Sequence, residues 1–491
     1  MRCLPSPRVL LLAALAVAGV AAPPSQAWAA AAAWDPPKDP TQGLQAREQQ
    51  PGLVRVELSA LGAGRGVRGG GGAKSAKSAK NLKKVTTRKG RAPQSPPAPR
   101  HPPLEVPQGR QGVLEPIYDP GGRALQPWHA ALGRVLQQKT TARIAFYGAS
   151  HTAADLWTGE LRRRLQMRYG DAGHGFALPT RFNPGYRHQD LVVESSKGWQ
   201  VLRHRRDDGA AIGSFGLAGM VMLSADPTEW TEVRTTQDNP QGRSFDRLQV
   251  WVAPQPGGGH WWLDLDGQRH ILDGGQAAAK VRQWDLPDSG HVLRLQPAGD
   301  GPVGLYGVVL ERSSGGVVID QLGIPGMRAE VHLHWQGQVW AEQLARRAPD
   351  LVVLAYGTND VGDPQSAADY AAEWLRVLQR VRAAAPQAAC VLVGPTDRLA
   401  KDDRGHWQPF ARTPEVIAVQ RRVAAQMGCG HWDAVAVMGG QGSMERWRRA
   451  GLAARDGVHL NRAGYTRLAE LFDAALHAGL AKVVSVPSRS P

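Results

Sequence analysis

Cysteine is scarce in this sequence, which has only Cys3, Cys390 and Cys429 among its 491 residues. None of them has histidine or further cysteine neighbours at metal-ligand spacing, so the sequence predicts no metal site. Cys390 and Cys429 each stand at the start of an apolar run that is typical of a strand. In an oxidising compartment these two residues would form a disulfide, and two buried free thiols are the alternative.

Long hydrophobic runs are also missing beyond the start of the chain, so no later segment is expected to cross a membrane. At the start, Arg2 and Arg8 precede an apolar stretch at 9–22, and Ala27-Trp28-Ala29 offers a small-residue cleavage site. This order is typical of a secretory signal peptide over residues 1–29. A retained membrane anchor is the alternative, for which the stretch is short. We expect an exported protein, either periplasmic or secreted.

Acidic residues are absent from residues 65–100, which contain eleven lysines and arginines and therefore much of the net charge of +16. The surrounding segment, 30–112, is rich in Pro, Gly and Lys and has no apolar periodicity, so we expect a disordered linker. Its basic charge favours anionic wall polymers or lipid headgroups as partners, with nucleic acid a weaker candidate. A solvated spacer without a partner is equally compatible with this composition.

Beyond the linker, short apolar runs alternate with amphipathic stretches. The alternation predicts an α/β domain with a parallel sheet covered by helices. The expected strands are 143–147, 317–319, 351–355, 391–393 and 433–437. The expected helices are 128–136, 153–168, 334–346, 367–385, 416–426 and 462–478.

Between about residues 196 and 315 the pattern changes to short strands broken by Gly/Pro turns, without helical periodicity. We interpret this segment as a β-sandwich-like module inserted into the α/β domain. The expected organisation is a signal peptide (1–29), a linker (30–112), the first part of the α/β domain (113–195), the inserted module (196–315) and the second part of the α/β domain (316–485).

Ser150 follows an expected strand and precedes an expected helix, which places its hydroxyl at the carboxyl edge of the sheet. A serine hydroxyl is a weak nucleophile and needs a base nearby. His459 is the candidate base, and Asp456, three residues earlier, can reach the imidazole Nδ1 and leave Nε2 for Ser150. A helix cap at Ser150 and a polar loop at residues 456–459 are the structural alternatives.

Asn359 follows the expected strand 351–355, and Gly357 lets the chain turn there. Its side-chain amide can donate to a developing oxyanion, an interaction typically worth about 3 kcal/mol of barrier. Gly326, in the sequence Gly323-Ile324-Pro325-Gly326, can supply a backbone N–H to the same oxygen. Ordinary turn roles are the alternative for both residues.

These segments together resemble the SGNH hydrolases of the GDSL esterase type. Residues 148–150 match the family's first block, Gly326 the second, residues 357–359 the third and residues 456–459 the last. The resemblance implies a flavodoxin-like sheet, catalytic Ser150, Asp456 and His459, and an oxyanion hole made by Ser150, Gly326 and Asn359. It implies no metal or organic cofactor. Ala149 stands where the family usually has Asp, which puts local loop support in question rather than the mechanism.

In its expected export and its inserted β-module, the chain is similar to bacterial peptidoglycan O-acetylesterases. That resemblance implies a serine esterase that removes acetyl or other small acyl groups from a cell-wall or surface glycan. His151 would line the acyl pocket or pack locally. Alternation in the run 261–266 sends Trp262 outward, where it would present a sugar platform in a carbohydrate-binding module or pack under a loop.

Two other functions remain open from the sequence. The same acyl-Ser150 would serve a periplasmic glycan O-acetyltransferase in which a sugar hydroxyl replaces water. A glycan-binding protein on a degenerate hydrolase scaffold is the non-enzymatic alternative, which Ala149 favours. The joint presence of Ser150, Asn359, Asp456 and His459 argues for an enzyme.

Overall fold

The computed structural model describes residues 47–48, 53–57, 111–204, 213–274 and 280–480. The expected signal peptide and most of the expected linker lie outside these ranges. Two short strands, β1 (Arg47–Glu48) and β2 (Leu53–Glu57), fall inside the linker, and β2 pairs in parallel with β12 (Lys280–Ser289).

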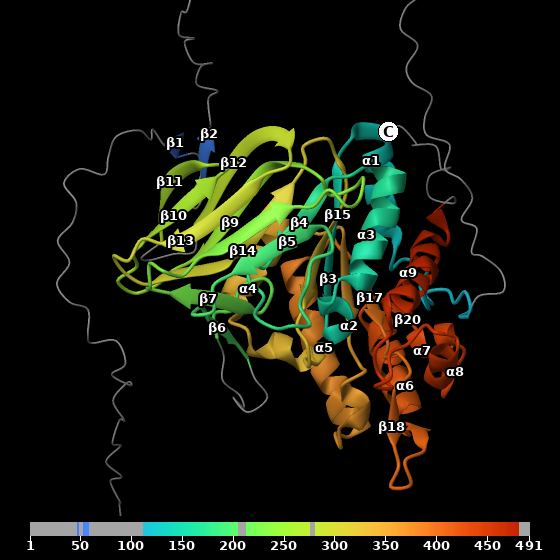
Figure 1. Ribbon diagram of the computed structural model, residues 1–491. Coiled ribbons are helices and arrows are strands. Elements are labelled where there is room, and N and C mark those ends of the chain that lie inside the picture. Colours follow the sequence, from blue (N-terminus) through green and yellow to red (C-terminus); the bar gives the residue numbers. More distant parts are fainter. Residues whose placement is uncertain (1–46, 49–52, 58–110, 205–212, 275–279, 481–491) are drawn as a thin grey trace, which may run out of the picture. The chain divides into compact units, whose positions relative to one another are not determined.

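A parallel sheet carries the α/β domain (Figure 1). When its strands are numbered by their order along the chain, they lie side by side in the order 2-1-3-4-5. This is the flavodoxin-like arrangement that the resemblance implied. The strands in spatial order are β15 (Gly316–Gly323), β3 (Thr141–Gly148), β16 (Leu351–Ala355), β17 (Ala389–Val393) and β20 (Gly430–Trp432).

Helices cover both faces of this sheet because its strands are apolar on both sides. Ile144 and Phe146 of β3 pack with α1 (Gln126–Gln138), α3 (Leu156–Tyr169) and α9 (Arg462–His477). The alternate residues Ala145 and Tyr147 join the core formed with α4 (Gly337–Arg347), α5 (Ala367–Ala384) and α6 (Thr413–Gln426). No described helix has the length and apolarity needed to cross a bilayer.

Some expected elements differ from those observed. Residues 433–437 were expected as a strand, but the strand is β20 and the following residues form α7 (Ala434–Met438). The Asp433 side chain accepts a hydrogen bond from Ala436 N at 2.9 Å and thereby caps this helix. The expected helix 153–168 is divided into α2 (Ser150–Ala153) and α3, with Asp155 at φ 52° between them. The first departure comes from the Asp433 cap, and the second from the left-handed backbone of Asp155, whose side chain does not cap α3.

The inserted segment forms two packed sheets, and strand pairing begins earlier than the expected residue 196. The first strand, β4 (Gly173–Ala177), pairs with β14, and β5 (Leu191–Ser195) pairs with β8. One sheet otherwise contains β12, β9 (Phe245–Ala253), β14 (Val303–Glu311), β7 (Met220–Ser224) and β6 (Gln200–Arg203). The other contains β11 (Gln268–Asp273), β10 (His260–Leu265), β13 (Val292–Pro297), β8 (Thr231–Thr235) and β5.

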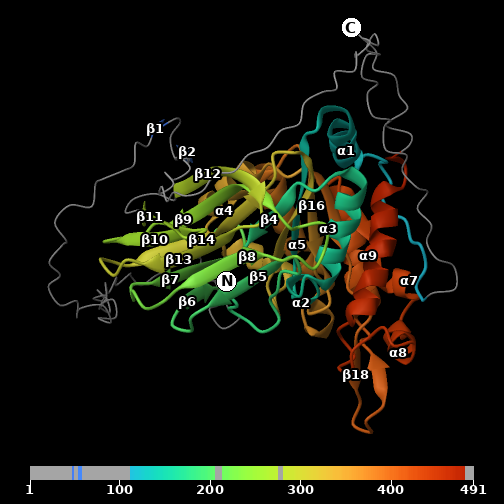
Figure 2. The same cartoon turned by 45° about the horizontal axis from the view of Figure 1, so that its top comes forward.

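The β-module is continuous with the α/β domain (Figure 2). Leu248 and Val250 of β9 face the second β-sheet, whereas Trp251 belongs to the core shared with α4, α5 and α6. A buried ion network also joins the two parts, because Arg347 of α4 pairs with Glu311 of β14 at 2.8 Å and with Asp320 of β15 at 2.7 Å. Burial alone would raise the pKa of Glu311, but the adjacent Arg347 and Arg143 lower it to about 2. We conclude that the module is an integral layer of the fold.

Cys390 of β17 and Cys429, just before β20, form a disulfide between neighbouring strands. This is the first of the two alternatives left open by the sequence.

Candidate active site

The candidate catalytic residues lie on loops at the carboxyl edge of the parallel sheet. Ser150 is the first residue of α2, directly after β3. The preceding Gly148 has no room for a side chain, since a Cβ there would lie 2.1 Å from Thr152 Oγ1 and 2.9 Å from the Ala355 carbonyl oxygen. The sharp strand-to-helix turn that exposes Ser150 therefore depends on glycine at this position.

The last block brings its acid and base to Ser150. His459 Nε2 lies 2.8 Å from Ser150 Oγ, and His459 Nδ1 lies 2.7 Å from Asp456 Oδ2. Asp456 Oδ1 also accepts hydrogen bonds from the backbone N–H groups of Val458 and His459, each at 2.9 Å. Burial raises the pKa of Asp456, but these hydrogen bonds from His459 and Val458 lower it below its usual value overall. With Nδ1–H donated to the carboxylate, Nε2 is free to accept the serine proton.

A small hairpin supports this loop, and sequence reasoning did not find it. The hairpin consists of β18 (Leu399–Lys401) and β19 (Trp407–Pro409). Leu399 N donates to the carbonyl oxygen of Gly457 at 2.8 Å. The Trp407 ring packs against the same glycine, where a Cβ would lie 2.7 Å from Trp407 Cζ3. The hairpin therefore holds the backbone between Asp456 and His459.

Gly326 and Asn359 occupy turns that face each other. Gly326 has φ +82° after Pro325, and Met327 N donates to Ile324 O at 3.3 Å, as in a type II turn. In such a turn the N–H of the glycine points outward, and among the described residues it makes no backbone hydrogen bond. Asn359 Nδ2 donates one hydrogen to Met327 O at 2.9 Å, which leaves its second hydrogen for another acceptor.

His151 is buried and lies behind His459. Its Nδ1 is 2.7 Å from the Tyr465 hydroxyl and its Nε2 is 3.1 Å from Thr396 Oγ1, so both ring nitrogens have protein partners. Burial, followed by the charge of His459, lowers the pKa of His151 to about 3 and keeps the ring neutral. This placement fits the local-packing alternative better than an acyl-pocket role.

Trp262 lies on the outer face of β10, whereas Trp261 is fully buried, as the alternation predicted. The Arg269 guanidinium stacks over the Trp262 ring at 4.2 Å from its centroid. The indole is therefore covered by a side chain of the neighbouring strand and is only partly exposed.

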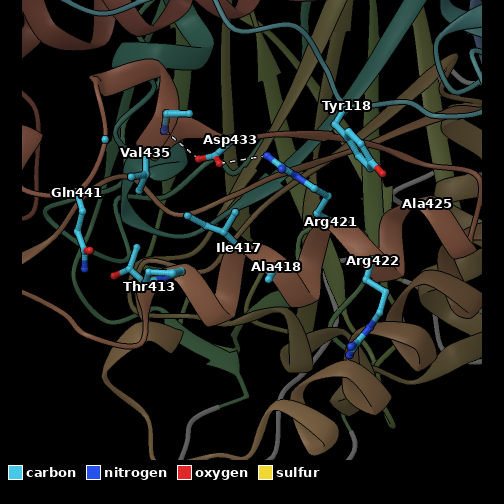
Figure 3. A pocket seen from close by; sticks show the side chains of 13 residues that line it. Tyr118, Thr413, Ile417, Ala418, Arg421, Arg422, Ala425, Asp433, Val435 and Gln441 are labelled. Atoms are coloured by element: carbon cyan, nitrogen blue, oxygen red, sulfur yellow. Dashed lines mark hydrogen bonds and ion pairs between the residues drawn. The ribbon is translucent and has the colours of Figure 1, made fainter.

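A separate cavity of about 690 Å³ lies along α6 (Figure 3). Its lining includes Tyr118, Ile417 and Arg421, and Arg421 pairs with Asp433 at 3.4 Å. The lining contains none of the residues that surround Ser150. In the part of the chain that the structure describes, no group of three or more His, Cys, Asp or Glu side chains is placed to hold a metal ion.

Arg328, Arg398, Thr396 and Tyr465 also contact the candidate site and were not found from the sequence. Arg398 Nη1 donates to Thr358 O at 2.9 Å, and Arg328 Nη2 donates to Asn359 O at 3.1 Å. Arg328 follows Gly326 by two residues, so proximity to a candidate block was the one available signal.

Comparisons with known proteins agree with this geometry. The GDSL-like lipase/acylhydrolase family model matches residues 289–467. That stretch contains Gly326, Asn359, Asp456 and His459, whereas Ser150 lies before the β-module. Among solved structures, a peptidoglycan O-acetylesterase is 28% identical, with a TM-score of 0.63, over 74% of this chain and 99% of that chain.

Other solved structures are less similar. The acetyl xylan esterase AlAXEase is 20% identical over 32% of this chain and 80% of that chain, with a TM-score of 0.26. A family two carbohydrate esterase from Cellvibrio japonicus is 11% identical over 59% of this chain and 98% of that chain, with a TM-score of 0.24. No match was found among curated proteins. The family match over residues 289–467 and the peptidoglycan O-acetylesterase likeness, together with the fold, identify a GDSL-like acylhydrolase domain of the SGNH type in this chain and support its activity as a serine esterase.

Proposed function

We propose that this esterase is exported and removes O-acetyl groups from a cell-wall glycan through an acyl-serine intermediate. The contact series from Asp456 through His459 to Ser150, at 2.7 Å and 2.8 Å, is the observation that carries the chemistry. The glycan substrate is supported by the similarity to a peptidoglycan O-acetylesterase over 74% of the chain.

In the proposed mechanism Ser150 Oγ attacks the acetyl carbonyl carbon while its proton passes to His459 Nε2. The carbonyl oxygen becomes an oxyanion that accepts hydrogen bonds from the N–H groups of Ser150 and Gly326 and from Asn359 Nδ2. When the intermediate collapses, the ester C–O bond breaks and His459 returns the proton to the sugar oxygen. A water molecule then repeats these steps on the acyl-serine and releases acetate.

Solvent access favours hydrolysis over transfer to a second sugar. The side chains of His459 and Asp456 are 39% and 48% exposed, so water reaches the base in the open site. A transferase must exclude water from its acyl-enzyme. We therefore expect free acetate, and no acetylated acceptor, when the protein acts on O-acetylated peptidoglycan in the presence of de-acetylated glycan. Acetyl groups recovered on the acceptor would instead establish the transferase.

The β-module is proposed to hold the glycan through the outer face of β10. Trp262 and the stacked Arg269 offer an indole edge and a planar guanidinium to a sugar chain. A Trp262→Ala variant should bind insoluble peptidoglycan more weakly in a sedimentation assay while keeping kcat on 4-nitrophenyl acetate. Equal sedimentation of the parent and the variant would remove this role.

Export and the role of the basic segment are proposals that rest on sequence. Residues 1–29 are proposed as a cleaved signal peptide and residues 30–112 as a linker that contacts anionic wall polymers or lipid headgroups. Deleting residues 30–112 from the mature protein should reduce salt-sensitive binding to cell walls and leave ester hydrolysis intact.

A further inference from the structure

The two turns that carry Gly326 and Asn359 are joined by an arginine. Arg328 Nη2 donates to the main-chain carbonyl oxygen of Asn359 at 3.1 Å and to Asp363 Oδ1 at 2.8 Å, while its Nε donates to Asp363 Oδ2. The guanidinium thus makes a bidentate pair with Asp363 and reaches the Asn359 backbone with the same planar group.

A second hydrogen bond runs in the opposite direction between the same turns. The Asn359 side-chain amide donates to Met327 O at 2.9 Å, and Met327 lies between Gly326 and Arg328. Each turn therefore donates to a main-chain carbonyl of the other. The Asn359 backbone is held by Arg328, and its side chain is held by the residue that follows Gly326.

The far end of the Asn359 turn is anchored independently. Asp363 terminates the short helix η3 (Asp360–Gly362), and its carbonyl oxygen accepts from Arg412 Nη1 at 2.7 Å. Because Arg412 holds the backbone of Asp363, the Arg328–Asp363 pair in turn holds Arg328 and the adjoining Gly326 turn in place. The Arg328 and Asp363 side chains are only 17% and 15% exposed, so the pair is partly shielded from water.

The charge of Arg328 is retained in this setting. Burial by itself would lower the pKa of Arg328, but the hydrogen bond and charge of Asp363 raise it overall. A lysine would keep the charge but lacks the planar fork needed to contact Asp363 and the Asn359 carbonyl together.

We propose that Arg328, held by Asp363, is a positioning residue that fixes the Gly326 N–H and the Asn359 amide at the spacing required by one oxyanion. This inference rests on the proposed oxyanion role of Gly326 and Asn359. Arg328 itself need not contact the substrate. Its loss loosens two donors at once, so it lowers kcat and leaves ground-state binding largely unchanged.

The test is a double-mutant cycle between Arg328 and Asn359, with kcat and KM measured on 4-nitrophenyl acetate. Removing one oxyanion donor typically costs about 10²–10³-fold in kcat. We expect Arg328→Ala to lower kcat by about 10–100-fold and to change KM by less than about twofold. In an Asn359→Ala background the same substitution should cost less than it does in the parent, because only one of the two donors that Arg328 positions, the Gly326 N–H, is left to be loosened. Arg328→Lys should not rescue kcat.

The matched control is Arg380→Ala. Arg380 of α5 also donates to a main-chain carbonyl, that of Trp335 at 2.9 Å, but it does not contact the Gly326 or Asn359 turn. Its removal should leave kcat near that of the parent. Added guanidinium at concentrations below those that unfold the protein should partly restore kcat in Arg328→Ala and should leave Asn359→Ala unchanged.

An unchanged kcat in Arg328→Ala, or full losses that multiply in the double variant, would overturn the proposal. If Arg328→Ala does not fold, Asp363→Asn serves in its place, with a smaller loss of kcat that is again non-additive with Asn359→Ala. The proposed function fails separately, through retained activity in Ser150→Ala, and the positioning role would fail with it. Activity that depends on Ser150 but not on Arg328 overturns only the positioning role.

Discussion

Removal of the Cys390–Cys429 disulfide has a cost that can be worked out from the structure. The two residues are 39 positions apart, and the loop that they close contains α6 and the β18–β19 hairpin. In the chain-entropy account, closing a loop of this length stabilises the folded protein by about 4 kcal/mol. Both side chains are 1% exposed, so alanine at both positions also removes buried sulfur from well-packed sites. We expect the double alanine variant to lose about 4–5 kcal/mol of unfolding free energy.

The assay is urea unfolding followed by tryptophan fluorescence, with the reduced parent as the matched control. The reduced parent should lose about 4 kcal/mol, because it loses only the cross-link. Thiol titration in denaturant should find no free thiol in the mature oxidised protein, since Cys3 lies in the expected signal peptide. A loss below about 1 kcal/mol, or two titratable thiols in protein recovered from an oxidising compartment, would refute the reasoning.

Three further predictions concern the site and its surroundings. Gly148→Ala should displace Ser150 because the new methyl group would lie 2.1 Å from Thr152 Oγ1; we expect kcat to fall by about 100-fold, and an unchanged kcat would contradict the steric argument. Trp407→Ala should lower kcat by about tenfold with little change in the unfolding midpoint, because the indole packs on Gly457 in the catalytic loop. Equal kcat values for the folded variant and the parent in steady-state kinetics would contradict this role. Burial, followed by the charge of Glu330, raises the pKa of Asp360 to about 7, so the folded state binds more protons than the unfolded state between about pH 4 and pH 7. Unfolding free energy should therefore fall as the pH rises through this window, and Asp360→Asn should flatten that fall; an identical pH profile in both proteins would refute the assignment.

Sequence patterns predicted strands β3, β15, β16 and β17 of the parallel sheet and indicated the four family blocks. The apolar run at 351–355 is bounded by charged and Gly-containing segments. In the structure the same residues, Leu351–Ala355, form strand β16. The blocks are recognisable because Gly148, Gly357 and the spacing of Asp456 and His459 impose local geometry. The Asp456 carboxylate reaches the imidazole within one short loop.

The missed features depend on contacts between residues far apart in sequence. Nothing local marks Trp407, because its importance comes from packing on Gly457, about fifty residues later. The pairing of β4 with β14 and of β5 with β8 likewise joins segments far apart in sequence, and it precedes the change in sequence rhythm. The expected strand at 433–437 shows the limit of apolar periodicity in short runs, where a single capping Asp433 decides for a helix.

Acetate release from O-acetylated peptidoglycan should be measured for the mature protein and for its Ser150→Ala variant. We expect steady release by the parent and a loss of that release by several orders of magnitude in a variant that unfolds at the same temperature. Equal release by both proteins would show that Ser150 is not the nucleophile. A parent that hydrolyses activated esters through Ser150 but releases no acetate from the glycan would contradict the proposed substrate.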